Sequence, residues 1–229
     1  MRQKMYGQDI ELSKKIAAER AVEFVKDGML VGLGTGSTAE YAIRKLAKKN
    51  LDIIAIPTSK RTEKLAKKLK IPLAKMNEYR EIDMDIDGAD EVDPQFNLIK
   101  GGGGAHTREK RIAERAKVFI VIVDHTKLVK KLGNFPVAIE VESSKRNFVE
   151  EKLKKLGGIP RLRKNFITDS GNIIIDTRFD IENPYELEEK LDSIPGVIEN
   201  GIFSKRKPEM VIVGYGTEVE ILKRKNESG

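Results

Sequence analysis

Short apolar runs and longer segments with helical spacing alternate through the first 130 residues. Apolar runs lie at 29–34 (MLVGLG), 51–57 (LDIIAIP) and 118–124 (VFIVIVD). Helical patterns lie at 9–26, 37–49, 60–70 and 106–117. The acidic stretch 81–93 and the segment 96–100 (FNLIK) are further strand candidates. Strands that alternate with helices in this way predict parallel βαβ units, with helices on both faces of the sheet. The sequence therefore predicts an α/β protein with a Rossmann-like, mostly parallel sheet.

The pattern changes after Lys131. Strand, helix, strand, strand, helix and strand patterns follow at 135–141, 146–157, 160–166, 173–180, 184–196 and 197–203. This order is typical of the ferredoxin-like split βαβ unit. The next apolar run, PEMVIVGYG, is too hydrophobic for an edge strand, so we expect it to return to the first sheet. We predict a Rossmann-like catalytic domain at 1–130 and 206–229, and a smaller inserted α+β domain at 131–205.

Composition excludes several classes of function. The chain has no cysteine, which rules out disulfides, thiolate metal sites and cysteine catalysis. Its net charge of +7 comes from basic residues interleaved with acidic ones, which favours solvated helix faces over a nucleic-acid surface. No apolar run approaches the roughly 18 residues of a membrane span, and MRQKMYGQDIELSKK lacks the apolar core of a signal peptide. We therefore expect a cytoplasmic protein with no membrane partner and a frayed KRKNESG tail.

A glycine- and hydroxyl-rich segment, GLGTGSTA at 32–39, separates a predicted strand from a predicted helix. Backbone amides at a helix N-terminus bind anions, and Thr35, Ser37 and Thr38 add hydroxyl donors. The segment also fits a variant of the dinucleotide-binding motif, but the acidic residue expected about 20 positions later is missing and PTS at 57–59 stands there. We expect a small phosphorylated ligand rather than a nicotinamide cofactor, and a simple capped turn is the structural alternative.

The acidic stretch DIDGADEVD places Asp87 and Asp90 on a turn between strands. An EF-hand calcium loop is excluded, because the glycine has the wrong offset and the terminal glutamate is missing. Open α/β sheets bind ligands at the carboxyl ends of their strands. Two carboxylates at that edge suit proton transfer or the binding of sugar hydroxyls. An ordinary solvated acidic turn remains the alternative.

Four glycines lie between Lys100 and a helix start in KGGGGAHTREK. A P-loop is excluded, because Gly-Lys-Ser/Thr does not follow the glycines. We expect Thr107 to cap the helix and Glu109 to lie in its first turn. A carboxylate there can be ionised at pH 7 and still basic enough to remove a proton. An ordinary first-turn charge is the alternative for Glu109.

The two histidines, His106 and His125, are too few for a metal cluster, and we expect both to lie beside the site or on the surface, without a catalytic role.

Five motifs, in this order and spacing, resemble the type A family of ribose-5-phosphate isomerases: GLGTGSTA, IPTS, DGADEVD, KGGGGA and REK. The resemblance runs through nearly the whole chain. It implies interconversion of D-ribose 5-phosphate and D-ribulose 5-phosphate, in the pentose phosphate pathway, through a cis-enediolate and without metal or cofactor. By this resemblance Glu109 is the base that moves a proton between carbons 1 and 2, and Lys100 stabilises the negative oxygen of the enediolate. Asp87 would take part in ring opening and, with Asp90, would hold the sugar hydroxyls.

The resemblance implies further substrate-binding positions. Carried over residue by residue, they are Thr35, Gly36, Ser37, Thr38, Gly88, Ala89, Gly101, Gly102, Gly103 and Lys127. The first four match the phosphate-binding segment of the family, and Lys127 matches a substrate-contacting lysine. Members of the family are usually homodimers or homotetramers, so we expect one of these states.

Three other functions remain open on the residues alone. A sugar-phosphate deaminase or a coenzyme A transferase can have a similar architecture, so fold alone does not distinguish these enzymes from an isomerase. Activity on an amino-sugar phosphate would identify the deaminase. A transcriptional sensor would need a DNA-binding domain, for which the roughly 28 residues before Met29 are too few. A nicotinamide-dependent enzyme would bind that cofactor.

Overall fold

The computed structural model describes residues 10–224. The chain divides into two units, each described by itself. The first unit comprises residues up to Gly88, Arg111–Lys127 and the chain from Pro208, and the second comprises Ala89–Lys110 and Leu128–Lys207. The predicted domains are also interleaved along the chain. They differ from the two units in placing residues 89–110 in the domain of the parallel sheet, whereas these residues belong to the second unit.

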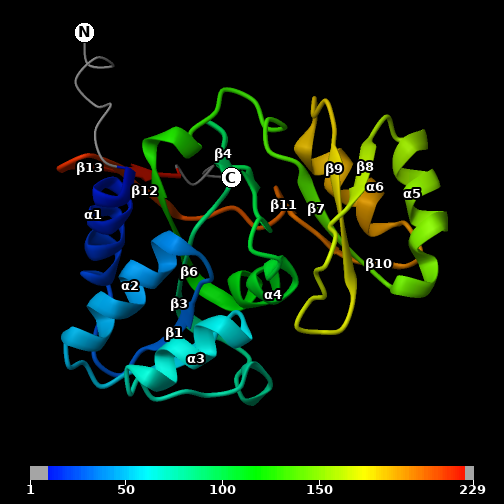
Figure 1. Cartoon of the computed structure of the whole chain (residues 1–229). Helices are drawn as coiled ribbons and strands as arrows, with labels where there is room; N and C mark the ends of the chain where they lie inside the picture. Colours follow the sequence, from blue (N-terminus) through cyan, green and yellow to red (C-terminus); the bar gives the residue numbers. More distant parts are fainter. Residues whose placement is uncertain (1–9, 225–229) are drawn as a thin grey trace, which may run out of the picture. The chain divides into compact units, whose positions relative to one another are not determined.

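The first unit contains a six-stranded sheet in the order β13-β12-β6-β3-β1-β2 (Figure 1). Its strands are β1 (Leu30–Leu33), β2 (Ile54–Pro57), β3 (Ile82–Asp87), β6 (Ala116–Asp124), β12 (Met210–Tyr215) and β13 (Glu218–Lys223). All neighbouring pairs are parallel except β12 and β13, which are antiparallel. The predicted Rossmann-like, mostly parallel sheet is confirmed.

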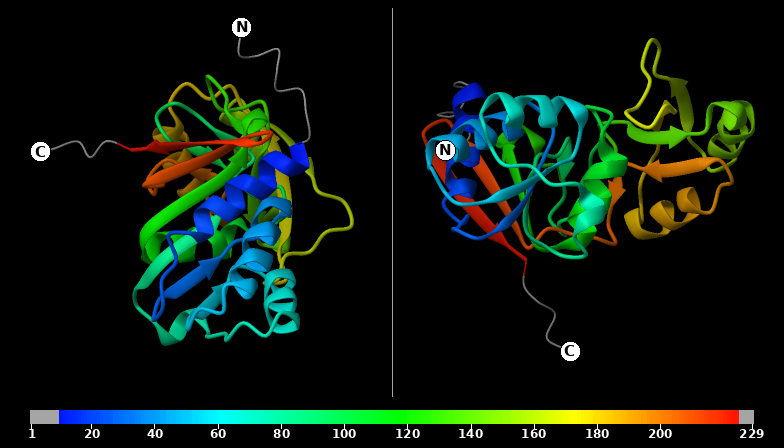
Figure 2. Two further views of the ribbon diagram at one scale, coloured as in Figure 1. Left: turned by 90° about the vertical axis from the view of Figure 1, so that its left-hand side faces the viewer. Right: turned by 90° about the horizontal axis from the view of Figure 1, so that it is seen from below.

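The return of the chain to this sheet is also confirmed. Strand β12 pairs with β6 on one side and with β13 on the other, so it is not an edge strand. Figure 2 shows the hairpin of the orange β12 and the red β13 beside the green β6. Strand β13 was not expected from the sequence. Its residues are only half buried or exposed, as befits an edge strand with weak apolar character.

Helices pack on both faces of the first sheet. The helices of this unit are α1 (Ile10–Val22), α2 (Ser37–Lys48) and α3 (Lys60–Lys68), together with the second half of α4 (His106–Arg115). Because side chains alternate along a strand, Val31 and Leu33 join the core under α1 and α2, whereas Leu30 packs with Ile112 of α4 on the opposite face. Because β1, β2, β3, β6 and β12 are parallel, their carboxyl ends lie at one edge of the sheet.

The second unit contains the predicted ferredoxin-like arrangement. Its four strands, β7 (Val137–Val141), β8 (Ile159–Leu162), β9 (Ile173–Arg178) and β10 (Val197–Asn200), form an antiparallel sheet in the order β10-β7-β9-β8. Helices α5 (Arg146–Lys155) and α6 (Pro184–Asp192) complete the split βαβ order. Their buried side chains pack with those of β7 and β9 in a separate core.

A small third sheet belongs to the second unit. It has the order β11-β5-β4, with strands β4 (Glu91–Val92), β5 (Leu98–Ile99) and β11 (Ile202–Phe203). The single strand predicted at 197–203 is wrong: the chain turns at Gly201, so that β10 and β11 enter different sheets. Residues 10–224 also contain three short 3-10 helices: η2 (Met76–Glu78), η3 (His125–Lys127) and η4 (Ser143–Lys145).

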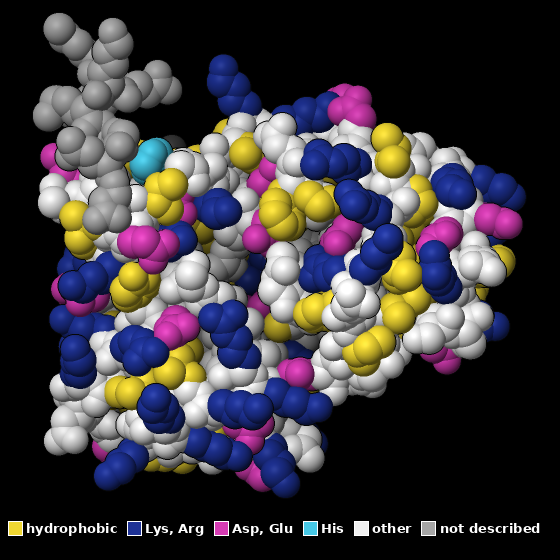
Figure 3. Space-filling view, viewed as in Figure 1, with side chains coloured by type: hydrophobic (Ala, Val, Ile, Leu, Met, Phe, Trp, Pro, Cys, Tyr) yellow, Lys and Arg dark blue, Asp and Glu magenta, His cyan; other side chains and the backbone are white. Residues whose placement is uncertain are grey.

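The visible surface carries both signs of charge. Lys and Arg side chains are interspersed with Asp and Glu (Figure 3). Pairs such as Glu40–Arg44 and Glu63–Lys67 follow the helical spacing of four residues. Across residues 10–224, no helix has the length and apolar character needed to cross a membrane. The predicted frayed tail and the start of the chain lie largely outside the described residues.

Candidate active site

The first unit places the glycine- and hydroxyl-rich segment between β1 and α2. Helix α2 begins at Ser37, as predicted, and its N-cap residue is Gly36. Gly36 has φ 135°, a conformation that suits glycine, and it offers no side chain to the first amides of the helix. Ser37 is exposed, and Thr35 and Thr38 are half buried. These amides and hydroxyls can bind an anion in the way the sequence predicted.

A cluster of hydroxyl groups supports this segment. The Thr35 Oγ1 atom lies 2.8 Å from Thr58 Oγ1, 2.7 Å from Ser59 Oγ and 2.9 Å from Thr62 Oγ1. Thr62 also donates to the carbonyl oxygen of Gly34 at 2.9 Å. Thr58 and Ser59 belong to the PTS segment that the sequence showed at 57–59, whereas Thr62, in the first turn of α3, was missed. The Thr35 hydroxyl is therefore held by the protein itself.

Asp87 lies at the carboxyl end of β3, next to the end of β1 in the sheet. Its Oδ1 atom accepts hydrogen bonds from the N–H groups of Thr35, at 3.0 Å, and Gly88, at 2.7 Å. A Cβ atom on Gly34 would collide with the Asp87 carboxylate, which explains the glycine at that position. Asp87 is fully buried, so the alternative of a solvated acidic turn is wrong for this residue.

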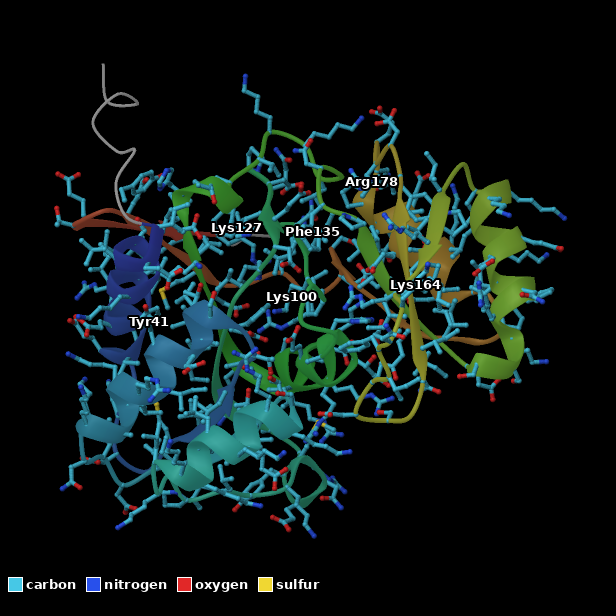
Figure 4. All side chains as sticks on the ribbon, in the orientation of Figure 1. Tyr41, Lys100, Lys127, Phe135, Lys164 and Arg178 are labelled. Carbon is cyan, nitrogen blue, oxygen red and sulfur yellow. The ribbon has the colours of Figure 1, made fainter. Side chains whose placement is uncertain are left out.

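Lys127 ends the 3-10 helix that follows β6, and its side chain is half buried (Figure 4). Asp124, the last residue of β6, accepts a hydrogen bond from the N–H of Thr126 at 3.0 Å and so shapes this turn. The imidazole of His125 stacks on Tyr215, with 5.6 Å between ring centroids. Lys127 therefore lies at the same carboxyl edge of the sheet as Asp87.

The four glycines form a turn in the second unit. The N–H of Gly104 donates to the carbonyl of Gly101 at 2.9 Å, so the glycines form one tight turn with Gly102 and Gly103 exposed. Gly101 and Gly104 have φ of 106° and 73°. A Cβ atom would meet Ala138 and the His106 ring at Gly101, the Asp90 carboxylate at Gly102 and the Phe166 ring at Gly104. Backbone conformation and close packing both require glycine at Gly101 and Gly104, and close packing requires it at Gly102.

Asp90 contacts the glycine turn directly. Its Oδ2 atom accepts a hydrogen bond from the N–H of Gly102 at 2.8 Å, and its own N–H donates to the carbonyl of Ile99. The following Glu91 is buried and accepts from the N–H groups of Gly133 and Phe135. Burial raises the pKa of Glu91 despite these donors. Asp90 and Glu91 therefore hold two different backbone segments, which a merely solvated turn would not do.

Lys100 and Glu109 form a buried ion pair. The distance between Lys100 Nζ and Glu109 Oε2 is 3.3 Å, and the side chains are 3% and 4% exposed. Lys100 follows β5, and Glu109 lies in the first turn of α4, as predicted. The alternative of an ordinary first-turn charge is wrong, since such a charge would be solvated. The predicted cap is also wrong: Thr107 lies inside α4, where its hydroxyl donates to Glu140.

An aromatic ring and a second lysine adjoin this pair. Lys100 Nζ lies 5.5 Å from the centroid of the Phe203 ring, and Lys110 Nζ lies 4.9 Å from it. Lys110 also pairs with Glu188 and Glu199, each at 2.9 Å. Burial raises the pKa of Glu188, but the Lys110 ammonium and the donors of Ser204 outweigh it, so the pKa lies below its usual value. Phe203 carried no sequence signal, and Lys110 was assigned no role although it belongs to the REK motif.

The two histidines differ in their surroundings. His106 is fully buried, which corrects any surface placement, and burial together with the nearby Lys110 ammonium lowers its pKa from 6.5 to about 3. His125 is half buried beside Tyr215. Among the described residues, no three His, Asp or Glu side chains are grouped so that they could hold a metal ion.

Comparison with known proteins decides the family. The family model for ribose 5-phosphate isomerase A (phosphoriboisomerase A) matches the sequence at residues 54–218. Ribose-5-phosphate isomerase A of Legionella pneumophila (strain Lens) is 46% identical over 209 residues, which are 90% of this chain and 97% of that protein. The chain belongs to the ribose-5-phosphate isomerase A family. The resemblance inferred from the five motifs is confirmed.

Solved structures of ribose-5-phosphate isomerases have the same fold. The enzyme of Neisseria gonorrhoeae superposes with a TM-score of 0.93 at 39% identity and covers 95% of this chain and 99% of its own. A D-ribose-5-phosphate isomerase in complex with phospho-erythronic acid superposes with a TM-score of 0.92 at 44% identity. The match covers 95% of this chain and 100% of that one. The predicted fold class, a Rossmann-like sheet with a smaller antiparallel domain, agrees with these neighbours.

Proposed function

We propose that this chain interconverts D-ribose 5-phosphate and D-ribulose 5-phosphate, as an aldose–ketose isomerase of the pentose phosphate pathway. The observation that carries the proposal is the buried pair of Lys100 and Glu109 beside a glycine turn. A carboxylate and an ammonium group removed from water are the two groups that enediolate chemistry needs, a base and an electrostatic stabiliser. Membership of the family supports the substrate.

In the proposed reaction Glu109 removes the proton from carbon 2 of the open-chain aldose. The electrons of that C–H bond form the double bond between carbons 1 and 2, and the carbonyl oxygen at carbon 1 becomes negative. The Lys100 ammonium stabilises this oxygen. Glu109 then returns the proton to carbon 1, while the hydroxyl proton on oxygen 2 passes to oxygen 1, which leaves a carbonyl at carbon 2. The base is regenerated, and no external oxidant or reductant is consumed.

The remaining residues are proposed to bind the substrate. The phosphate is assigned to the amides and hydroxyls of Thr35, Gly36, Ser37 and Thr38 and to Lys127. The sugar hydroxyls are assigned to the turn from Asp87 to Asp90, including Gly88 and Ala89, and to the turn of Gly101, Gly102 and Gly103. Asp87 is proposed to assist ring opening. Support comes from the buried, hydrogen-bonded state of Asp87 and from the uncapped amides of α2.

Incubation with ribose 5-phosphate in heavy water, with a metal chelator present and no cofactor added, tests this function. The expected result, followed by NMR, is the appearance of ribulose 5-phosphate with deuterium at carbon 1, and of deuterium at carbon 2 of the ribose 5-phosphate that the reverse reaction forms. Folded protein that gives neither conversion nor exchange would contradict the proposal and return attention to a deaminase or a sensor. An amino-sugar phosphate in a parallel reaction tests the deaminase directly.

We also propose a cytoplasmic homodimer or homotetramer that binds neither nucleic acid nor membrane. The family resemblance supports the oligomeric state, and the interleaved surface charge supports the absence of nucleic-acid binding. Sedimentation equilibrium distinguishes the two assemblies. A gel shift that weakens steeply as salt rises would contradict the absence of nucleic-acid binding.

A further inference from the structure

The connection between β8 and β9, residues 163–172, belongs to the ferredoxin-like part of the second unit. Lys164 marks its start in Figure 4. This segment has no counterpart among the sequence motifs, and the proposed reaction assigns it no role. It nevertheless contacts the glycine turn and the first turn of α4, which carry the proposed catalytic groups.

Arg163 makes the central contacts of this connection. Its Nε and Nη2 atoms donate to the two carboxylate oxygens of Asp176, at 2.9 and 2.5 Å. Its Nη1 atom donates to the carbonyl oxygens of Gly101, at 3.1 Å, and Gly102, at 3.3 Å. The guanidinium also lies 5.3 Å from the centroid of the Phe166 ring. The planar fork of arginine therefore joins a strand carboxylate to two successive peptide groups of the glycine turn.

These contacts determine which way the two peptide groups face. In a trans peptide the C=O and the N–H point in opposite directions. The peptide between Gly101 and Gly102 is held at both ends, because its oxygen accepts from Arg163 and its N–H donates to Asp90. The next peptide presents its oxygen to Arg163, so the N–H of Gly103 points away from the guanidinium. Among the described residues, no group accepts a hydrogen bond from this N–H.

Other residues of the connection hold the neighbouring positions. The Phe166 ring occupies the space that a side chain on Gly104 would need. Thr168 donates to the buried carboxylate of Glu140 at 2.8 Å, and the Thr107 hydroxyl of α4 donates to the same carboxylate. The connection therefore supports the backbone on both sides of the first turn of α4.

We propose that Arg163 is a positioning residue for the isomerase reaction. This inference rests on the proposed function. Arg163 acts through the glycine turn: it keeps the carbonyl ends of two peptide dipoles away from the substrate and leaves the Gly103 N–H as a donor to the sugar or enediolate oxygen. Glycine has the most conformational freedom of any residue, so a turn of four glycines needs an outside group to select one orientation. Asp176 in turn orients the guanidinium.

Arg163→Met removes the guanidinium and keeps an unbranched side chain. We expect kcat to fall by about 10- to 100-fold, because small misplacements of aligned groups have effects of this size. KM should change by less than about threefold, since the phosphate is assigned to a different segment. Arg161→Met, in the exposed part of the preceding strand, is the matched control and should keep the wild-type kcat.

A second readout separates positioning from a loss of folded protein. In protein labelled with ¹⁵N-glycine, the amide signals of Gly101–Gly104 should move in Arg163→Met and stay in place in Arg161→Met. With ribose 5-phosphate deuterated at carbon 2, the fraction of label carried to carbon 1 should fall. If the variant were only partly unfolded, its folded molecules would show the amide signals at the wild-type positions and the wild-type fraction of label transfer.

If Arg163→Met does not accumulate as folded protein, Arg163→Lys decides the question. Its ammonium can pair with Asp176 but cannot also donate to both glycine carbonyls in one plane, so a reduced kcat is again expected. Wild-type kcat and label transfer in a folded Arg163 variant would overturn the inference. Wild-type protein that converts no ribose 5-phosphate would instead overturn the proposed function, so the two failures are distinct.

Discussion

Lys100 Nζ lies 3.3 Å from Glu109 Oε2, and both side chains are almost completely removed from solvent. Lys100 follows a two-residue strand, whereas Glu109 belongs to the helix beyond the glycine turn. The turn therefore does more than connect these elements. It lies between a base and a cation that meet as a neutralised pair.

Glu109→Gln should reduce kcat by about 10²- to 10⁴-fold, the usual contribution of a general base. The amide keeps the shape of the carboxylate but cannot take the proton, so the dissociation constant of ribose 5-phosphate should change little. Steady-state kinetics and calorimetric titration check both expectations. Glu114→Gln, an exposed change on the same helix, is the control. Near-normal turnover in Glu109→Gln would exclude the assignment.

Lys100→Met should destabilise the fold as well as stop turnover. It leaves the Glu109 carboxylate buried without its ammonium partner, and breaking a buried pair in this way typically costs about 3–5 kcal/mol. The double variant Lys100→Met/Glu109→Gln should regain part of that loss, because the unpaired charge is gone. Urea denaturation of the single and double variants measures the difference. If Lys100→Met and the double variant had the same free energy of unfolding, the two side chains would not stabilise each other as proposed.

Thr62→Val should weaken phosphate binding and leave the proton-transfer step less affected. The hydroxyl lies 2.9 Å from Thr35 Oγ1 and donates to the Gly34 carbonyl, so its loss loosens the segment assigned to the phosphate. We expect KM to rise about three- to tenfold, which corresponds to a hydrogen bond of about 0.5–1.5 kcal/mol. Thr177→Val makes the same chemical change at a buried hydroxyl that has no partner among the described residues, and KM should stay unchanged.

Gly104→Ala should destabilise the protein more than Gly171→Ala. Both glycines have positive φ, 73° and 88°, which costs an alanine about 1–2 kcal/mol. Only at Gly104 would the new methyl group also collide with a ring, that of Phe166, whereas the space around Gly171 is open. Overpacking adds about 1–3 kcal/mol. Thermal unfolding of the two variants gives the comparison, and equal losses would mean that the ring moves aside freely.

His106 should make stability depend on pH below neutrality. Its pKa is about 3 in the folded protein against 6.5 ordinarily, because burial and Lys110 disfavour the charged form. Between these values the unfolded chain binds more protons, so stability is present above pH 6.5 and is lost as pH falls toward 3. His106→Gln should remove up to about 1.4 kcal/mol per pH unit of this slope. Chemical denaturation from pH 4.5 to 7.5 measures it, and parallel curves would argue against it.

Several elements of the fold could be predicted because their signals are local. Period-2 and period-3.6 patterns indicated the parallel sheet, the helices and the split βαβ order, and glycines and hydroxyls indicated the start of α2. The edge strand β13 was missed, since its residues carry little apolar alternation and it forms only by pairing with β12. The strand read through Gly201 was divided because the chain changes sheets there.

The site divides in the same way. By itself, the sequence determined the chemical groups available: a lysine, a glutamate, paired aspartates, a hydroxyl-rich helix start and a run of glycines. Only the tertiary structure decided that Lys100 meets Glu109, that Thr107 turns to Glu140 instead of capping its helix, and that Arg163 reaches Gly101 across 62 residues of sequence. The physical reason is that residue types and spacing act through neighbouring backbone, whereas the partner of a buried charge depends on which distant segments pack around it.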